Sequence, residues 1–352
     1  MIYLINQDWY NTSNNHAGIK YLCNKLVEMY PHSYRAISNP AVLPPAAKRP
    51  RNRILRKIQY WRAMISHRKN LQTIFNEVSS NITPDDKIIL MEYMEVLYPM
   101  DTLAMKFKKA LPNNKLYAMV HLVPARLDKD FKSDDKFREW LSHVDKVLTL
   151  GHSLTDYLIA RGVAKDKIVT TFHYVDDYYF NNNPLKVGNP VQVIAMGSQM
   201  RNIPLLSKIV ADNPEAKFVI CQGFSDLSSY FSESKNVRLI PFVPENELRK
   251  LMEESDISLN VMEDTIGSNV IVTSLAMGLA MVCSDVGSIH DYCSESNTFF
   301  CLNDKPKNFT DAIQKLSSDD ALLCRMKQAS REKSKNLSID NFCNSIQSIC
   351  EG

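Results

Sequence analysis

Paired cysteines are missing from this chain of 352 residues, which contains no Cys-x-x-Cys motif. The Cys and His residues also lack the spacing of metal-binding motifs, so we predict no bound metal. Scattered cysteines in a chain without a secretion signal are typical of reduced thiols, most of them buried. The eight cysteines are residues 23, 221, 283, 293, 301, 324, 343 and 350.

Long apolar runs are missing as well, and no stretch approaches the roughly 20 residues that cross a membrane as a helix. Residues 1–8 lack the basic start and the small-residue cleavage site of a signal peptide, and they are typical of a buried strand instead. Hydrophobic residues make up 45% and charged residues 23% of the chain, a balance that excludes a disordered protein. We therefore expect a cytoplasmic protein of two ordinary domains.

Acidic residues are missing between residues 31 and 66, although the whole chain has a net charge of only +3. This basic segment also contains four apolar residues at helical spacing: Ile54, Ile58, Trp61 and Ile65. A basic amphipathic helix of this kind predicts that residues 48–69 bind an anionic membrane surface. The alternative is a helix packed on the core with a solvated basic back. Nucleic acid is disfavoured because no binding motif accompanies the charge.

Strand and helix patterns alternate along the chain, with no internal repeat of solenoid period. The buried strands are predicted at residues 2–6, 36–38, 87–91, 115–121, 144–150, 167–172, 191–196, 217–221, 237–239, 257–261, 279–283 and 298–302. Helical segments separate most of them, which predicts an α/β protein with parallel sheets. Asn- and Pro-rich residues 181–190 have the composition of a linker and place a domain boundary near residue 180.

Several polar side chains follow the ends of these strands. His16 lies in the loop after the first strand, Glu92 and Glu95 follow the strand at 87–91, and His121 ends the strand at 115–121. Ligands of open parallel sheets gather beyond the carboxyl ends of the strands. We therefore predict that His16, Glu92 and Glu95 line an acceptor-side site and that His121 is catalytic. The alternative is that each is a loop residue whose polar atoms are satisfied locally.

Residues 265–291 form the stretch around which the second half is organised. Gly267, Ser268 and Asn269 form a turn of small residues that leaves backbone N–H groups accessible, because Gly permits close approach and Ser and Asn favour helix N-caps. An apolar helix at residues 270–277 follows, and Gly278 ends it. Amides at the N-terminus of a helix bind anions, so this turn predicts a phosphate or diphosphate site.

This stretch resembles the donor-binding region of GT-B glycosyltransferases, in particular glycosyltransferase family 4. That family typically reads E-G-F-x-x-x-x-x-E-A-x-A-x-G-x-P-V-V-x-x-D-x-G-G, and residues 268–271, 276–278 and 284–287 fit the pattern. Thr265 and Thr273 stand where the family has the two glutamates of its E-x7-E signature. The resemblance therefore supports the fold and the diphosphate site more strongly than it supports the chemistry.

A second passage, residues 144–176, resembles the family's sequence at the junction between its two domains. The resemblance implies the GT-B fold, in which two Rossmann-like domains with parallel sheets face a central cleft. It predicts an acceptor-side N-terminal domain at residues 1–180 and a nucleotide-sugar-binding domain at residues 181–335. A C-terminal helix at residues 336–352 would pack back on the first domain.

The resemblance also implies roles for individual residues. Donor-diphosphate contacts fall on Gly197, Ser198, Arg201, Gly267, Ser268, Asn269 and Val270. Relatives carry an arginine where this chain has Ser198, so Arg201 would supply the cation; the alternative is a solvent-facing arginine. Thr265 takes the catalytic position beside the transferred sugar, and Thr273 takes the position that binds the nucleotide ribose. Glu263 would restore a catalytic carboxylate if the loop shifts by two positions, and Gly18 matches a small-residue position on the acceptor side.

Together these features predict a glycosyltransferase of hexosyltransferase type that acts in surface polysaccharide biosynthesis. Its substrates would be a nucleotide-diphosphate sugar and a glycan or lipid-linked saccharide acceptor, with no cofactor, at the inner face of the plasma membrane. Family resemblance favours a retaining, metal-independent reaction, whereas an inverting enzyme would need a base from His16, Glu92, Glu95, Asp101 or His121. The alternatives are a catalytically silent GT-B protein that binds nucleotide or glycan, and a nucleotide-sugar epimerase.

Overall fold

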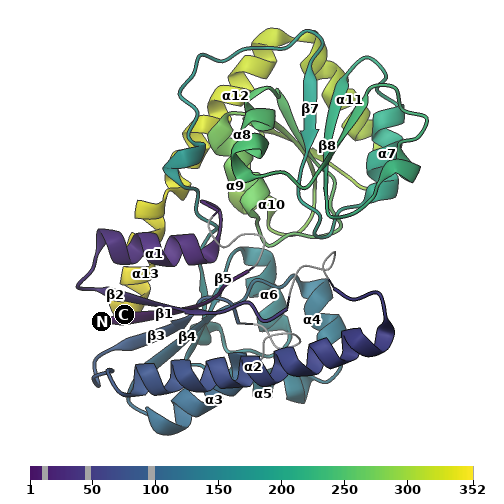
Figure 1. Ribbon diagram of the computed structural model, residues 1–352. Helices are drawn as coiled ribbons and strands as arrows, with labels where there is room; N and C mark the ends of the chain where they lie inside the picture. The colour runs from purple at the N-terminus through teal and green to yellow at the C-terminus, as the bar shows by residue number, and fades with distance from the viewer. Residues whose placement is uncertain (10–14, 44–48, 94–99, 352) are drawn as a thin grey trace. The chain divides into compact units, whose positions relative to one another are not determined.

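The computed structural model describes residues 1–9, 15–43, 49–93 and 100–351 (Figure 1). Glu95 therefore lies outside the described residues, as does the side chain of Asp101. The chain divides into two compact units, which we describe one at a time. Unit 1 comprises Met1–Thr171 with Cys343–Gly352, and unit 2 comprises Phe172–Phe342.

These limits differ from the predicted boundaries at residues 180 and 335. Residues after 171 are tied into unit 2: the amide of Val175 donates to the carbonyl of Leu337 at 2.7 Å, and the Phe172 ring lies edge-on to Phe342 with centroids 5.8 Å apart. The amide of Asn181 donates to the carbonyl of Ala276 at 3.2 Å. The linker-like residues 181–190 are consequently a surface segment of unit 2 rather than the junction.

Unit 1 is built on a six-stranded parallel sheet in the order β2-β1-β3-β4-β5-β6. Its strands are β1 (Ile2–Gln7), β2 (Tyr34–Asn39), β3 (Lys87–Leu90), β4 (Lys115–Met119), β5 (Lys146–Thr149) and β6 (Ile168–Thr170). The central strands are almost continuously apolar and buried, as parallel strands covered on both faces must be.

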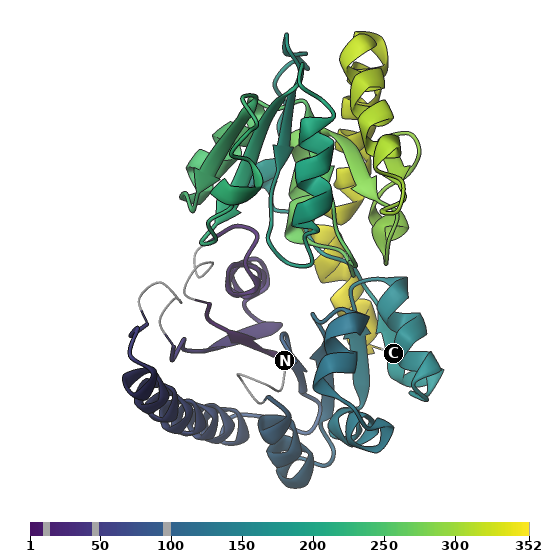
Figure 2. The ribbon, with the colours of Figure 1, turned by 90° about the vertical axis from the view of Figure 1, so that its right-hand side faces the viewer.

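Helices cover both faces of this sheet, and Figures 1 and 2 show α1 on one face and α2 with α3 on the other. The helices of unit 1 are α1 (Ile19–Met29), α2 (Arg53–Ser79), α3 (Met100–Ala110), α4 (Pro124–Asp130), α5 (Asp134–Ser142), α6 (His152–Ala160) and the 3-10 turn η2 (Lys165–Lys167). The last helix of the chain, α13 (Ile339–Glu351), begins in unit 2, and its residues from Cys343 onward belong to unit 1. There the Cys343 Sγ lies 3.6 Å from the Tyr34 Oη at the start of β2.

Unit 2 repeats the architecture with a parallel sheet in the order β12-β11-β10-β7-β8-β9. Its strands are β7 (Gln192–Ala195), β8 (Lys217–Gly223), β9 (Val237–Pro241), β10 (Ile257–Asn260), β11 (Ala280–Ser284) and β12 (Thr298–Cys301). The core lies between this sheet and its helices, with Val193, Ile209, Phe218 and Phe309 fully buried.

The helices of unit 2 lie on both faces, with α7 and α11 on one and α8, α9 and α12 on the other (Figures 1 and 2). They are α7 (Ile203–Ala211), α8 (Glu245–Glu253), α9 (Asn269–Met277), α10 (Ile289–Tyr292), α11 (Pro306–Ser318) and α12 (Asp320–Ser334), with 3-10 turns η3 (Asp177–Tyr179), η4 (Ser228–Tyr230) and η5 (Lys335–Leu337). The predicted limits of α9 are confirmed within one residue. Ser268 is its N-cap, and Gly278 ends it with a left-handed φ of 74°.

Candidate functional site: a nucleotide-diphosphate site in unit 2

The strand order of unit 2 reverses between β7 and β10. From β7 the chain proceeds outward through β8 and β9, then returns to β10 on the other side of β7 and continues through β11 and β12. The connections leave the two neighbouring strands in opposite directions at such a switch point, so a crevice opens beyond their carboxyl ends, where ligands of α/β proteins bind. The residues predicted to bind diphosphate lie in the loops that follow β7 and β10 and in the first turn of α9. They are Gly197, Ser198 and Arg201 after β7, and residues 267–270 after β10.

Backbone hydrogen bonds join these two loops. The amide of Asn202 donates to the carbonyl of Val261 at 3.0 Å, and the amide of Glu263 donates to the carbonyl of Met200 at 2.8 Å. Arg201 and Met262 thereby form a short antiparallel bridge. The position of Arg201 is therefore fixed to the loop after β10, which leads to α9.

The loop after β7 has a conformation that favours contact with an anion. Gly197 and Met200 both adopt left-handed backbone angles, with φ of 74° and 54°. A Cβ on Gly197 would lie 3.0 Å from the Cγ2 atom of Val270, so a glycine here lets the loop approach the first turn of α9. Turns that combine left- and right-handed residues direct successive N–H groups toward one point. Ser198 is exposed in this loop.

The N-terminus of α9 presents backbone N–H groups. Ser268 accepts the Ile271 amide on its side chain at 3.3 Å and the Val272 amide on its carbonyl at 3.2 Å. Among the described residues, the amides of Ser268 and Val270 have no partner. These amides and the positive end of the helix dipole form an anion-binding turn, together with Asn269 at the first helical position.

Arg201 is the residue predicted to supply the positive charge of the diphosphate site. Its Nη1 donates to the carbonyl of Cys221 at 3.0 Å, which fixes the guanidinium at the carboxyl end of β8. Its Nη2 is buried and has no hydrogen-bond partner among the described residues. Burial lowers the pKa of Arg201, but a guanidinium remains charged in proteins. The alternative of a solvent-facing arginine is therefore wrong, and the side chain is a half-satisfied cation suited to an anionic ligand.

Gly267 is fixed by packing behind the turn. Its φ is 96°, and a Cβ at this position would overlap the ring of Tyr292 in α10. The Tyr292 hydroxyl in turn accepts the amide of His173 at 2.8 Å, so the ring cannot move aside cheaply. Gly267 also donates its amide to the Thr265 hydroxyl at 3.1 Å. The turn is therefore preorganised by a contact that sequence patterns do not reveal.

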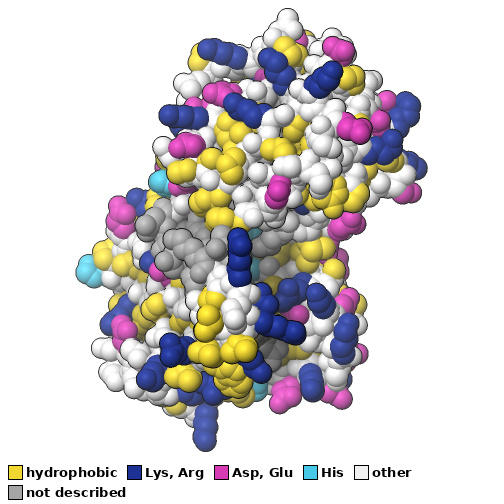
Figure 3. Space-filling view, turned by 45° about the vertical axis from the view of Figure 1, so that its right-hand side comes forward, with side chains coloured by type: hydrophobic (Ala, Val, Ile, Leu, Met, Phe, Trp, Pro, Cys, Tyr) yellow, Lys and Arg dark blue, Asp and Glu magenta, His cyan; other side chains and the backbone are white. Residues whose placement is uncertain are grey.

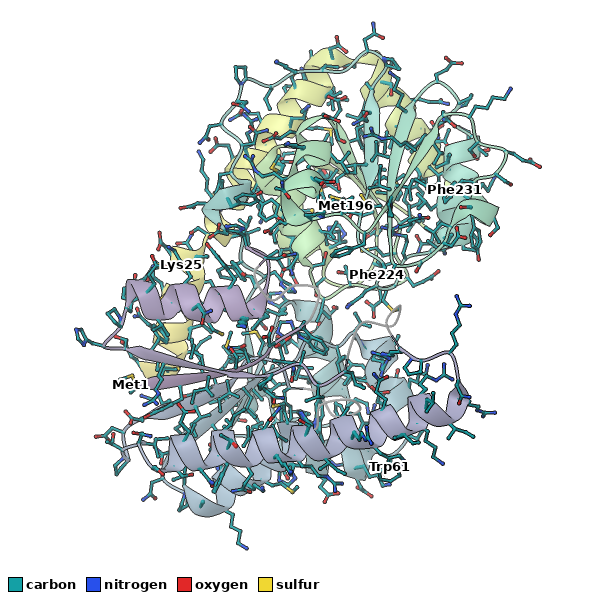
Figure 4. All side chains as sticks on the ribbon, viewed as in Figure 1. Met1, Lys25, Trp61, Met196, Phe224 and Phe231 are labelled. Atoms are coloured by element: carbon teal, nitrogen blue, oxygen red, sulfur yellow. The ribbon has the colours of Figure 1, made fainter. Side chains whose placement is uncertain are left out.

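Two aromatic residues were missed by the sequence analysis. Phe224 and Phe242 follow the ends of β8 and β9, and their rings stack with centroids 4.5 Å apart and an interplanar angle of 12°. Both side chains are exposed, and Figure 4 shows Phe224 projecting from the end of β8. Their positions in the sequence could have indicated a role in binding, because a residue directly after a buried parallel strand lies at the edge of the sheet where ligands bind. Exposed aromatic faces can stack on a nucleobase.

Unit 1 has its own switch point, between β1 and β3. Glu92 lies there, almost fully buried, and its carboxylate accepts hydrogen bonds from the Gln7 amide at 2.8 Å and from the Trp9 indole N–H. Burial raises the pKa of Glu92 to about 7, and the charge of Asp8 adds to the rise, while the two hydrogen bonds oppose it. The predicted acceptor-side residue is thus a carboxyl group that is partly protonated at neutral pH.

A buried polar network supports this position. The Asn39 side-chain amide donates to the Gln7 Oε1 at 2.6 Å and lies 3.2 Å from the Nδ1 of His67. Gln7 returns a hydrogen bond to the Asn39 carbonyl at 3.0 Å. Because β1, β2 and α2 each contribute one residue, the network holds three elements together below Glu92.

The remaining acceptor-side residues occupy three different environments. His121 donates from its Nε2 to the Met91 carbonyl at 2.9 Å, and burial lowers its pKa to about 4, so the ring is neutral at pH 7. The His16 ring packs on Tyr21 with centroids 4.7 Å apart. Gly18 caps α1 and donates its amide to the carbonyl of Asn15 at 2.8 Å. The structure brings His121 and Glu92 to neighbouring strand ends and places His16 and Gly18 at the start of α1.

Residues 190–319 match the family model described as "Glycosyl transferases group 1". They contain the loops after β7 and β10, Arg201 and α9, which form the candidate diphosphate site described above. Residues 190–319 are a group 1 glycosyltransferase domain. No curated protein matches the chain in a sequence search.

Solved structures show the fold of the whole glycosyltransferase. HepE from Anabaena, solved in complex with UDP and also with UDP-glucose, matches with a TM-score of 0.73 for the UDP complex at 12% identity, over 100% of both chains. Sucrose-phosphate synthase from Thermosynechococcus elongatus matches with a TM-score of 0.74 at 12% identity, over 99% of this chain and 98% of that one. The lipopolysaccharide outer core galactosyltransferase WaaB matches at 0.68 and 11%, over 99% of both. The predictions of the GT-B fold and of a glycosyltransferase are confirmed.

Thr265 and Thr273 occupy the two positions at which the resemblance to family 4 implies glutamates. Thr265 is buried and its hydroxyl accepts the Gly267 amide, while the Thr273 hydroxyl donates to the Asn269 carbonyl at 2.6 Å. Both hydroxyls are therefore used inside the turn and helix. Glu263 is exposed and accepts a hydrogen bond from the Asn202 side chain, and Asp264 accepts the Thr265 amide at 2.7 Å. Of the acidic residues near the motif, Glu263 is thus the more accessible.

Among the described residues, no three His, Cys, Asp or Glu side chains gather as a metal site would require. Within the same part of the chain, none of the helices has the length and apolar character needed to cross a membrane.

Proposed function

We propose that this glycosyltransferase transfers a sugar from a nucleotide-diphosphate sugar to a glycan or lipid-linked saccharide acceptor. The observation that carries the proposal is the half-satisfied guanidinium of Arg201, which lies at the carboxyl end of β8. It belongs to the loop after β7, and the N-terminus of α9 follows the neighbouring strand β10 at the same switch point of the glycosyltransferase domain. Charge-assisted hydrogen bonds to phosphate would satisfy both features together. UDP and UDP-sugars are the first donors to test, because HepE was solved with them.

Diphosphate departure is proposed to proceed without a metal ion. Negative charge builds on the leaving phosphate in the transition state, and preorganised donors that face it lower the barrier. Arg201 supplies a full positive charge and the turn at 267–270 supplies amides and a helix dipole. These groups are held in place by β8, β10 and Tyr292 before the donor arrives, so little reorganisation is required.

Retention of the anomeric configuration is the stereochemical proposal. An inverting enzyme needs a protein base that can receive the proton of the acceptor hydroxyl. In a retaining enzyme the leaving phosphate can receive this proton instead, and the resemblance to glycosyltransferase family 4 favours that reaction. Proton NMR of the first product tests this, and a product of inverted configuration would reject it.

The acceptor and cellular setting are inferred from neighbours and charge. WaaB acts on the lipopolysaccharide outer core, which supports a saccharide acceptor attached to lipid and a role in surface polysaccharide biosynthesis. We place the enzyme at the cytoplasmic face of the plasma membrane, as a peripheral protein.

A catalytically silent nucleotide-binding protein is the second candidate, favoured by Thr265 and Thr273 in place of carboxylates. Thermal unfolding with a panel of nucleoside diphosphates, in the presence of EDTA, tests the shared part of both proposals. A ligand at 100 times its dissociation constant stabilises the fold by about 2.7 kcal/mol. Release of UDP from a UDP-sugar would then separate the enzyme from the silent protein. Failure of every nucleotide to stabilise the chain would overturn both.

A further inference from the structure

The first half of α2 exposes large apolar side chains to solvent. Ile54 is 71% exposed and Trp61 is 61% exposed, and Ile58 and Ile65 are exposed as well. We name these four residues the exposed stripe. The sequence left open whether they pack on the core, and the structure excludes that alternative.

The face of α2 that packs on unit 1 is a different one. Its buried residues are Ala63, His67, Leu71, Ile74 and Val78. At about 100° per residue these side chains point roughly 150° away from the exposed stripe. They also begin only at Ala63, so the first turns of α2 extend beyond the part of the helix that the core covers. In Figure 4, Trp61 lies on the side of α2 turned away from the sheet.

Basic side chains border the exposed stripe on both sides. Lys57 and Arg68 follow one edge at helical spacing, and Arg62 and Lys69 follow the other. All four are exposed, and none forms an ion pair with another described residue. No acidic residue occurs in the sequence between residues 28 and 77. Figure 3 shows hydrophobic side chains over α2 with Lys and Arg beside them.

This combination selects one kind of partner. An apolar stripe with cations on both flanks fits the interface of an anionic bilayer, where the apolar groups enter the acyl boundary and the cations meet lipid phosphates. Trp is also a favoured residue at that depth. A second copy of the chain fits poorly, because two such surfaces would bring like charges together. We propose that α2 lies flat on an anionic membrane surface through the exposed stripe, with Lys57, Arg62, Arg68 and Lys69 on lipid headgroups.

Vesicle binding of the full chain tests this proposal. With vesicles of phosphatidylcholine containing about one third phosphatidylglycerol, we expect co-sedimentation and a blue shift of Trp61 fluorescence, whereas pure phosphatidylcholine should give little of either. Replacing Ile58 and Trp61 together with serine should weaken binding at least about tenfold. Replacing Lys57 and Arg62 together with glutamine should weaken it about fivefold per charge and flatten its salt dependence.

Met105→Ser is the matched control, because Met105 is an exposed apolar residue on α3 of the same unit. It should bind vesicles as the unaltered chain does. Equal binding by the Ile58→Ser/Trp61→Ser variant would overturn the proposal. So would a dimer in light scattering that this variant abolishes, since the stripe would then join two copies. Thermal stabilisation of the chain by nucleotide, measured without vesicles, tests the proposed donor site separately from membrane binding.

Discussion

Arg201 is the residue on which the donor site depends most. Its Nη1 is held by the Cys221 carbonyl, which leaves Nη2 for a phosphate oxygen. Replacing Arg201 with Gln should lower the affinity for UDP by about tenfold to one hundredfold, because a hydrogen bond to a charged group contributes about 1.5–3 kcal/mol. Arg201→Lys should recover only part of the loss, since an ammonium group cannot bridge both partners with a planar fork.

Titration calorimetry with UDP and with uridine separates the phosphate contribution from the rest. Uridine lacks the diphosphate, so its affinity should be the same in the Arg201 variants and in the unaltered chain. A parallel loss for both ligands would mean that the substitutions disturb the fold around β8 rather than a phosphate contact.

Glu263 is the acidic side chain best placed to replace the missing family glutamate. It is exposed at the end of β10, and its contact with Asn202 fixes it beside the loop after β7. We expect Glu263→Gln to reduce turnover by at least about one hundredfold with little change in UDP affinity, as for a group that acts mainly in the transition state. Asp264→Asn is the control, because Asp264 already accepts the Thr265 amide. Unchanged turnover in Glu263→Gln would remove Glu263 from the chemistry.

At the scale of the element, the turn before α9 packs so closely on Tyr292 that residue 267 has no room for a side chain. Gly267→Ala should destabilise unit 2 by about 2–4 kcal/mol, because a Cβ combines left-handed strain with overlap on Tyr292. Gly223→Ala is the control: its φ of 59° is also left-handed, but a Cβ there has no neighbour within 4 Å. It should cost only about 1 kcal/mol.

Urea unfolding and UDP titration of both variants check this expectation. Gly267→Ala should also weaken UDP binding, because the amides at 268–270 move with the turn. Equal destabilisation by the two substitutions would show that backbone strain alone, and not the Tyr292 ring, makes glycine necessary at position 267.

The stacked pair of Phe224 and Phe242 provides a second element-level test. If these exposed rings meet the nucleobase, Phe224→Ala and Phe242→Ala should each weaken UDP binding by about fivefold to one hundredfold, as for other base–aromatic contacts. Ribose 5-phosphate lacks a base, so its binding should not change. Tyr230→Ala removes another exposed aromatic of unit 2 and should leave UDP binding intact. Equal binding of UDP by all three variants would place the base elsewhere.

The elements themselves were largely predictable, because periodicity and capping are local. Ser268 and Gly278 delimit α9, and Asn52 caps α2 by accepting the amides of Ile54 and Leu55 at 2.9 and 3.2 Å. The contacts that make the site were not predictable. The overlap between Gly267 and Tyr292 joins residues whose proximity depends on tertiary packing, which no local pattern encodes.

At the scale of the whole molecule, the same distinction explains why the predicted boundary near residue 180 differs from the division between the two compact units at residue 171. The composition of residues 181–190 is that of a linker, but Val175 is hydrogen-bonded to Leu337, more than 160 positions further along the chain. This contact depends on where the chain returns just before α13. The composition of residues 181–190 carries no information about that position. The alternating βα pattern predicted an α/β protein with parallel sheets, and the resemblance of residues 144–176 and 265–291 to a known family implied the GT-B fold.

The stability of the molecule should depend on pH through two opposing groups of unit 1. Burial lowers the pKa of His67 from 6.5 to about 4, so the unfolded chain binds a proton first and stability is lost as the pH falls from 6.5 toward 4. Burial raises the pKa of Glu92 from 4.5 to about 7, so the folded chain holds the proton longer and stability is lost as the pH rises from 4.5 through 7. Each effect amounts to about 3 kcal/mol at most.

Urea unfolding between about pH 4 and pH 8 separates the two effects. The quantity to compare between variants is the slope of the free energy of unfolding against pH, not its absolute value. In Glu92→Gln the loss of stability on raising the pH should disappear. In His67→Gln the loss of stability on lowering the pH should become smaller. His121, whose pKa burial also lowers to about 4, still contributes to acid sensitivity in both variants. Parallel profiles for Glu92→Gln and the unaltered chain would mean that Glu92 is ionised when folded. Its hydrogen bonds from Gln7 and Trp9 would then outweigh burial, and a buried charge at the switch point of unit 1 would again be available as a base.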